Sequence, residues 1–434
     1  MLMYAAMRGA HKEIFDALRD IPVIDAHEHI PPEERRIARD ADVFEFFNVT
    51  GYHIEHELYR AGMDQQSYLQ LFDRNRSIPE RMAILEPYWQ RCRGTLFGRH
   101  VRLSVEKFYG FDDITPDNAQ AISQRMKSSN CAGLYKRILR DACNAECAIT
   151  QCGTADFASD TVKAVVPAPF ACVNITRENL VSPKADGSGG MRGYEEGWTA
   201  IAVPGFAVPP QGFSRYLECV EEYVNQSRRM GAIGVKMYAL PWGVPDRTAA
   251  ESGFMHVCGG GMLPEYGDNP LRDYVWDVIA DICGKLGLVV CVHSGFGGDW
   301  RYLRPSSLLS VVRRHPSVHF DVYHLGFPWV NEAAMLAYAN RNVSLDLCWL
   351  HVISQGMVID AMRMLADILT PGQVIAFGGD GIMAEKAYGH LLLSKENVAA
   401  AFAGIVNEGR MTLENAVDLA RRWYYDNPKE IYGL

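Results

Sequence analysis

The sequence predicts a (β/α)8 barrel, and three observations lead to that prediction. Eight short apolar runs alternate with longer segments of helical periodicity along the 434 residues, a rhythm typical of parallel βα units. Several of these runs are almost continuously apolar, as a strand covered on both faces requires. Polar side chains end four of the runs, and in a barrel the carboxyl ends of the strands form the functional face.

The eight expected strands are spread over the whole chain. They lie near residues 24, 148, 168, 235, 291, 321, 346 and 377. Helical patterns separate most of them, for example the segment from Arg215 and the segment after Asn269, a helix N-cap followed by proline at the first helical position. Residues 334–341 and 358–369 supply two more helices, and further helices are expected after the barrel from about Asn397.

One segment departs from the repeat. Residues 31–142, from Pro31 to Ala142, separate the first two strands and show helical patterns with many polar and aromatic groups. We expect a single domain over residues 1–434, with this segment as a helical insertion in the first βα loop. Such loops lie on the functional face, so the insertion is expected to cover the pocket and lend His53, His56 or Arg60 to it. A packing appendage is the alternative.

Composition narrows the possible partners. The formal net charge of −9 argues against a nucleic acid or an anionic membrane, because both require a basic surface. The first residues lack the apolar core of a signal peptide, and no apolar run approaches the ~20 residues of a membrane helix. Eleven scattered cysteines are expected to be reduced thiols of a cytoplasmic protein. We expect a small-molecule substrate and leave open a homo-oligomer. A Gly-rich, charged loop at 182–197 is expected to be mobile.

The first strand ends in two histidines, in the motif Asp25-Ala-His27-Glu-His29. Residues i and i+2 of a strand face the same side, so both imidazoles are expected to face the barrel axis. Two neutral ring nitrogens at that separation are natural ligands for zinc or a similar ion. An HxH pair is also common by chance, so the later strands decide its meaning.

Three later strands carry polar groups at the same end. His293, His324 and Asp380 each end an apolar run and are followed by glycine within two residues. Buried polar groups are costly without partners, so four strands that share this arrangement indicate a metal site. We expect one divalent metal there, with zinc as the first expectation and manganese or iron as alternatives.

This set of residues resembles that of the amidohydrolase superfamily, with HxH on strand one, histidines on strands five and six, and aspartate on strand eight. The resemblance implies that His27, His29, His293 and Asp380 bind one divalent metal. It also implies that His324 is an acid/base group beside the metal and that Asp380 handles the proton of the metal-bound water. The most similar subgroup includes decarboxylases and mononuclear hydrolases. The long insertion is similar to that of uronate isomerases and of the amidohydrolase-like module fused to glutamine-synthetase-like domains.

Further residues are expected near the mouth of the barrel. Lys236, on the fourth strand, corresponds to a lysine that many superfamily members carbamylate to bridge two metals, although we favour a salt-bridged or substrate-facing lysine. Arg301 and Arg304 flank Tyr302 after the fifth strand and are expected to clamp a substrate carboxylate. Trp349 is expected to form a pocket wall. A solvated loop and simple packing are the respective alternatives.

Three functions follow from these expectations. The first is a metal-dependent hydrolase, in which metal-activated water attacks a C–N or C–O bond of a small, carboxylate-bearing substrate. The second is a metal-dependent decarboxylase or a uronate-type isomerase, because the same ligands suit a carboxylate or adjacent sugar oxygens. The third, a non-catalytic binding protein, is disfavoured by the intact His and Asp set. The ligands alone do not choose between the first two.

Overall fold

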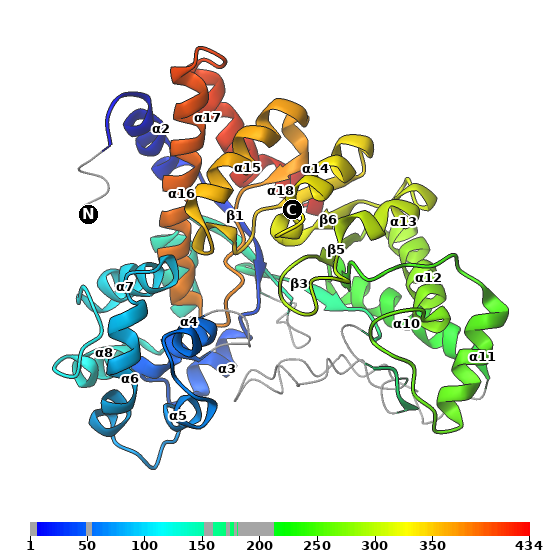
Figure 1. Ribbon diagram of the computed structural model, residues 1–434, viewed down its shortest axis with the longest axis horizontal. Helices are drawn as coiled ribbons and strands as arrows, with labels where there is room; N and C mark the ends of the chain where they lie inside the picture. The colour runs from blue at the N-terminus through cyan, green and yellow to red at the C-terminus, as the bar shows by residue number, and fades with distance from the viewer. Residues whose placement is uncertain (1–6, 49–53, 152–158, 171–173, 178–179, 181–211) are drawn as a thin grey trace.

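The computed structural model describes residues 7–48, 54–151, 159–170, 174–177, 180 and 212–434. These residues contain one parallel sheet of eight strands, paired in chain order from β1 to β8 (Figure 1). The predicted (β/α)8 barrel is therefore confirmed. The strands are β1 (Val23–Glu28), β2 (Ala145–Thr150), β3 (Val162–Pro167), β4 (Gly234–Tyr238), β5 (Val289–His293), β6 (Phe320–Val322), β7 (Val343–Asp346) and β8 (Val374–Ile375).

Hydrogen bonds between β1 and the segment after β8 bring the first and last strands together. The amide of Asp380 donates to the carbonyl oxygen of His27 at 2.7 Å, and the amide of His29 donates to the carbonyl oxygen of Gly381 at 2.9 Å. Strand β8 is shorter than expected and ends at Ile375. Asp380 therefore lies beyond the strand, in irregular backbone held against β1.

Apolar side chains fill both faces of the sheet. The barrel interior holds a small cluster that includes Ile24, Ala26 and Cys291. Tyr432, from the C-terminal helix, belongs to the same cluster, and its hydroxyl donates to Asp321 Oδ2 at 2.7 Å. A larger cluster lies between the sheet and the surrounding helices. Burial on both sides explains the nearly continuous apolar strands.

Helices surround the sheet. The Asn269 side chain accepts a hydrogen bond from the amide of Arg272, and Pro270 is the first residue of α12, so the predicted N-cap is confirmed. The helices of this layer are α2 (Gly9–Asp20), α10 (Phe213–Met230), α11 (Arg247–Cys258), α12 (Pro270–Leu286), η5 (Pro305–Leu308), α13 (Leu309–Arg314), η6 (Tyr323–Gly326), α14 (Val330–Ala339), η7 (Leu350–Val352), α15 (Gln355–Ile368), η8 (Pro371–Gln373), α16 (Ala384–Asn407), α17 (Leu413–Arg421), η9 (Arg422–Asp426) and α18 (Asn427–Tyr432).

Helices also occupy the long segment between β1 and β2, drawn in blue and cyan in Figure 1. Their core includes Trp349, Met383 and, at its edge, Phe296. These three residues follow β7, β8 and β5, so the segment packs on loops at the carboxyl ends of the strands. The elements are α3 (Glu33–Ala38), η1 (Val43–Phe47), α4 (Ile54–Arg60), α5 (Gln65–Gln70), α6 (Ile78–Cys92), α7 (Leu96–Tyr109), α8 (Ala119–Ser129) and the π-helix η2 (Lys136–Ala142).

Some boundaries differ from the sequence-based expectation. Strand β3 ends at Pro167, before the centre of the apolar run that predicted it. Helix α16 begins at Ala384, well before Asn397, because the helical pattern there is hidden in an almost wholly buried segment. The predicted mobile loop at 182–197 and His53 lie outside the described residues. Among the described residues, no helix has the length and apolar character needed to span a membrane.

Replacement of Asn269 by alanine is expected to destabilise the fold by about 1 kcal/mol, the usual effect of losing a helix N-cap. The change removes the acceptor for the Arg272 amide and also the donor to the Pro264 carbonyl oxygen. Urea denaturation followed by circular dichroism measures the effect. A midpoint equal to that of the unsubstituted protein would show that the cap contributes nothing.

Candidate metal centre

The β1 strand carries one residue more than its neighbour at the HxH motif. From Asp25 to Glu28, β1 advances three positions while β2 advances only two, from Ala148 to Thr150. An extra residue of this kind bends a strand and re-aims its side chains. Ala26 faces the barrel interior. Because of the extra residue in β1, His27 faces the interior as well.

Asp380 joins the two histidines of the motif. Its Oδ1 lies 3.0 Å from His27 Nε2 and 3.2 Å from His29 Nε2. Asp380 has a left-handed backbone, with φ of 51°, which is uncommon outside glycine. Backbone strain of this kind persists only where the surrounding structure holds it, and it is often found at functional sites.

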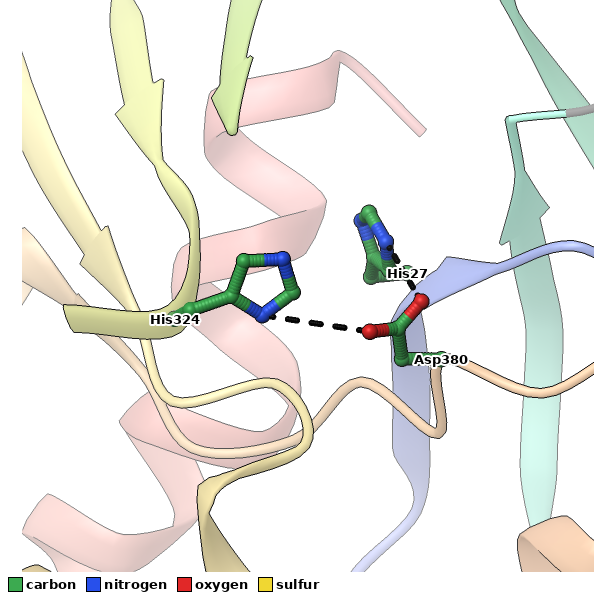
Figure 2. Close-up of side chains that lie close together, drawn as sticks. All are labelled: His27, His324 and Asp380. Atoms are coloured by element: carbon green, nitrogen blue, oxygen red, sulfur yellow. Dashed lines mark ion pairs between the residues drawn. The ribbon is translucent and has the colours of Figure 1, made fainter. Parts of the chain in front are cut away.

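His324, in the turn η6 after β6, completes a compact group with His27 and Asp380. Their possible ligand atoms all lie within 4.8 Å of one another, and no other such group of three occurs in the part of the chain that the structure describes. Figure 2 shows the three side chains converging from β1, from the turn after β6 and from the segment after β8. His324 Nδ1 lies 3.9 Å from Asp380 Oδ2.

His293, the last residue of β5, contacts this group through His324. Its Nδ1 lies 3.0 Å from His324 Nε2. Its Nε2 is buried and has no hydrogen-bond partner among the described residues. A Cβ at Gly297 would lie 2.6 Å from the His293 ring, so the glycine there leaves room for the imidazole.

The hydrogen bonds of the two histidines suggest where their lone pairs lie. His324 Nδ1 is 3.3 Å from the carbonyl oxygen of Cys348, which only accepts, and 3.2 Å from the Cys348 thiol, which can also donate. In the tautomer with the hydrogen on Nδ1, His324 accepts at Nε2 from His293 Nδ1, and His293 keeps its lone pair on the unpartnered Nε2. This tautomer favours His293 as a ligand, whereas the compact group favours His324. The expected division between ligand and acid/base group stays a prediction.

Burial sets the protonation of the group. Desolvation lowers the pKa of His324 to about 4. Burial also lowers the pKa of His27 and His293 well below the ordinary value, and the positive charge of Lys236 adds to this effect. Burial alone would raise the pKa of Asp380, but the charge and hydrogen bond of His27 hold that pKa well below its usual range.

The donors present fit a divalent metal. Metal ions bind neutral imidazole and ionised carboxylate, the forms that these pKa directions favour at neutral pH. Imidazole nitrogen with carboxylate oxygen is a ligand set used by zinc, iron and manganese. The buried, unpartnered Nε2 of His293 is costly to the fold unless a partner binds it. The ion would be held by His27, His29 and Asp380 together with His293 or His324, and His293 is the ligand expected from the sequence.

Lys236 of β4 is buried near the same group. Its Nζ lies 4.4 Å from the centroid of the Tyr323 ring, and the His27 ring lies 4.2 Å from that of Tyr323. An ammonium over an aromatic face is stabilised by the ring quadrupole. This contact is made by the unmodified side chain of Lys236. Carbamylation of Lys236 stays an alternative, which the number of metal ions per chain would test.

The two arginines predicted to clamp a substrate carboxylate have other partners in the structure. Arg301 pairs with Asp299 at 2.5 Å and its side chain is 71% exposed. Arg304 pairs with Glu332, and Tyr302 is partly exposed. None of these contacts reaches the histidine and aspartate group, so the clamp stays a prediction. A substrate carboxylate would have to compete with Asp299 and Glu332.

Trp349, by contrast, lies beside the group. Its ring is 5.8 Å from the His324 ring and stacks on Phe296 at 5.4 Å. His56, from the segment between β1 and β2, lies 6.1 Å from Phe296. This row of rings connects that segment to the site. Arg60, which was also expected to reach the pocket, has a mostly exposed side chain that pairs with Glu57. Trp349 is almost completely buried, so most of its surface serves packing.

Two buried carboxyl groups of the histidine motif, Asp25 and Glu28, were given no role from the sequence. Asp25 Oδ1 accepts a hydrogen bond from the Gly379 amide at 3.0 Å, and Glu28 Oε2 accepts one from the Gly381 amide at 2.7 Å. Burial raises the pKa of Asp25 to about 7 and that of Glu28 well above its ordinary value. The sequence did contain an indication of their role, because acidic residues inside an apolar strand destabilise the fold unless they have partners.

A parallel eight-stranded barrel with imidazoles and a carboxylate gathered at the carboxyl ends of its strands is the architecture of metal-dependent barrel enzymes. More particularly, the chain belongs to the amidohydrolase family, because the family model described as amidohydrolase matches residues 198–434. Membership of this family implies a divalent metal. It agrees with the resemblance found in the sequence.

Comparisons with individual proteins extend this assignment. Protein fluG of Emericella nidulans is 24% identical over 181 residues, which cover 39% of this chain and only 21% of that relative. The uronate isomerase of Thermotoga maritima superposes with a TM-score of 0.73 at 16% identity, over 98% of this chain and 97% of that chain. The glucuronate isomerase of Caulobacter crescentus gives 0.74 at 16% identity, over 98% and 94%.

A third solved structure, from Lactobacillus casei, is described only provisionally as a metal-dependent hydrolase. It gives a TM-score of 0.66 at 12% identity, over 97% of each chain. At such low identities, the likeness to the three solved structures shows a shared fold. The match extends over nearly the whole chain in each case, so it is not confined to the barrel strands.

His27→Ala is expected to empty the metal site, whereas His324→Asn is expected to keep the metal. Removal of a direct ligand weakens the metal site itself, but loss of an acid/base group does not. Elemental analysis of the purified variants measures this, with about one divalent ion per chain expected for the unsubstituted protein. Equal loss of metal in both variants would make His324 a ligand. Two metals per chain would support a carbamylated Lys236.

Proposed function

We propose that this chain is a metal-dependent enzyme that moves a proton on a small hydroxy acid, and that its reaction is the isomerisation of a uronate-type sugar acid. The observation that carries the proposal is the buried, neutral His324 beside Asp380, with His293 hydrogen-bonded behind it. An aldose–ketose isomerisation needs such a group, because a proton must leave one carbon and return to its neighbour.

The side chains of the site suit this task. Once bound, a divalent metal would polarise the adjacent oxygens of the substrate. His324 is neutral at pH 7, because burial lowers its pKa to about 4. It would act as the proton acceptor in the tautomer that carries its hydrogen on Nε2, since the lone pair of Nδ1 is then available. Positive charge that develops on His324 is stabilised by the Asp380 carboxylate, 3.9 Å away. His293 Nδ1, 3.0 Å from His324 Nε2, holds the orientation of the ring.

Similarity to known proteins supports isomerisation in particular. Two structures described as uronate and glucuronate isomerases match 98% of this chain, and this extent includes most of the helical segment between β1 and β2. That segment packs on the loops around the site, where it would enclose a bound substrate. If the same helical segment encloses the substrate in all three proteins, the substrates should be of similar size. A uronate is therefore the first candidate substrate.

Hydrolysis of a C–N or C–O bond is the second candidate. It is favoured by the amidohydrolase family model over residues 198–434, and the same ligands suit activation of water. In that reaction Asp380 would accept the proton of the attacking water and pass it to the leaving group. Decarboxylation of an organic acid uses the same ligands and is the remaining alternative of this kind.

Metal-loaded protein is expected to convert D-glucuronate to the corresponding ketose, followed by proton NMR. His324→Asn should lower turnover roughly 10²-fold, the usual contribution of a positioned proton carrier, while metal content stays unchanged. Protein stripped of metal by a chelator is the matched control. Inert glucuronate together with hydrolysis of N-acyl amino acids or lactones would contradict isomerisation and favour the second candidate. Full activity of His324→Asn would remove His324 from the mechanism.

A further inference from the structure

The segment that carries Asp380 is held by buried side chains and not by a regular strand. The amide of Gly379 donates to Asp25 Oδ1 at 3.0 Å, and the amide of Gly381 donates to Glu28 Oε2 at 2.7 Å. These two amides flank Asp380 in the sequence. Each of the two carboxyl groups is therefore bonded to one neighbour of the aspartate.

The register shift in β1 explains why Asp25 and Glu28 reach the same segment. Side chains alternate along a strand, so positions 25 and 28 would normally face opposite sides. One extra residue between them reverses the alternation and brings both carboxyl groups to the same side. The same shift turns His27 and His29 toward Asp380. A single irregularity thus sorts the motif into two metal-facing histidines and two loop-facing carboxyls.

The glycines before Asp380 lie between the histidines of the metal site and the carboxyl groups of Asp25 and Glu28. A Cβ at Gly379 would overlap Glu28 Oε1, and a Cβ at Gly378 would lie 2.7 Å from the His27 Cβ. On the carbonyl side, His390 Nδ1 lies 3.0 Å from the Gly379 oxygen. Only residues without side chains fit at positions 378 and 379, so the Gly378-Gly379 pair before Asp380 follows from the packing.

We propose that Asp25 and Glu28 are positioning residues of the metal centre, which hold the backbone on both sides of Asp380 and so place its carboxylate against His27 and His29. Each of the two is only 1% exposed, so both are enclosed by the protein and act through the groups that they contact. The proposal goes beyond the reaction but rests on the proposed metal site. Groups that orient metal ligands in this way typically contribute 10–100-fold in metal affinity.

Glu28→Ala tests the proposal by calorimetric titration of metal-free protein with zinc. Loss of the acceptor for the Gly381 amide is expected to lower zinc affinity about 10–100-fold. Glu28→Gln keeps an oxygen that accepts from this amide, so its affinity should stay within about threefold. Glu28→Asp, which withdraws the carboxylate by one methylene, should resemble alanine. It also serves as the second variant if Glu28→Ala does not fold.

Asp273→Ala is the matched control, because Asp273 is also a buried carboxylate that accepts from a backbone amide, that of Gly243 at 2.9 Å. It lies in α12, outside the histidine group. The control should lose stability without losing zinc affinity. Equal loss of affinity in Asp273→Ala and Glu28→Ala would overturn the proposal, since general destabilisation would explain both. Unchanged affinity in Glu28→Ala would also overturn it.

Hydrogen exchange of the Gly379 and Gly381 amides gives a readout that does not depend on metal. In metal-free protein, Gly381 should exchange faster in Glu28→Ala, whereas the Gly243 amide should exchange faster only in Asp273→Ala. If the unsubstituted protein bound no zinc or other divalent ion, the metal-site proposal would fail. The exchange rates would still decide whether Glu28 holds the segment. Unchanged exchange at Gly381 would overturn the positioning role.

Discussion

The buried carboxylate of Asp380 is the group on which the functional end of the barrel depends. A carboxylate removed from water is unstable unless charge or hydrogen bonds compensate for its desolvation. Here one oxygen contacts Nε2 of both His27 and His29, and the amide of the same residue donates to the His27 carbonyl. Barrel closure and the geometry of the site are therefore coupled, because the bonds that join the segment after the last strand to the first strand also place the carboxylate.

Irregular backbone around Asp380 follows from that requirement. His324, Trp349 and Asp380 all have positive φ and all follow a barrel strand. Positive φ is disfavoured for residues with side chains and persists where surrounding packing holds it. The helices between β1 and β2 supply much of this packing, since Trp349 and Met383 belong to their core. The helices that pack over the site therefore also hold the backbone that places His324, Trp349 and Asp380.

The same arrangement suits several reactions. Neutral imidazoles and an ionised carboxylate bind a metal whichever bond the substrate breaks, so the ligands define the family and not the reaction. Specificity belongs to the groups that meet the substrate. Exposed Arg301 and Arg304 are already paired with acidic side chains, whereas the row from His56 through Phe296 to Trp349 reaches His324. The helical cover is therefore the part of the molecule best placed to select a substrate.

The sequence by itself determined the barrel and the order and approximate positions of its strands, because strand and helix periodicities are local. It also proposed the residues of the site, because these polar residues follow apolar runs. It also predicted the cap at Asn269. Only the tertiary structure decided what these residues contact. The extra residue in β1 brings Asp25 and Glu28 to a segment more than 350 positions later, and no local pattern specifies such a pairing. Likewise, the 3.0 Å contact between His293 and His324 depends on how two strands are placed by the packing of the whole barrel.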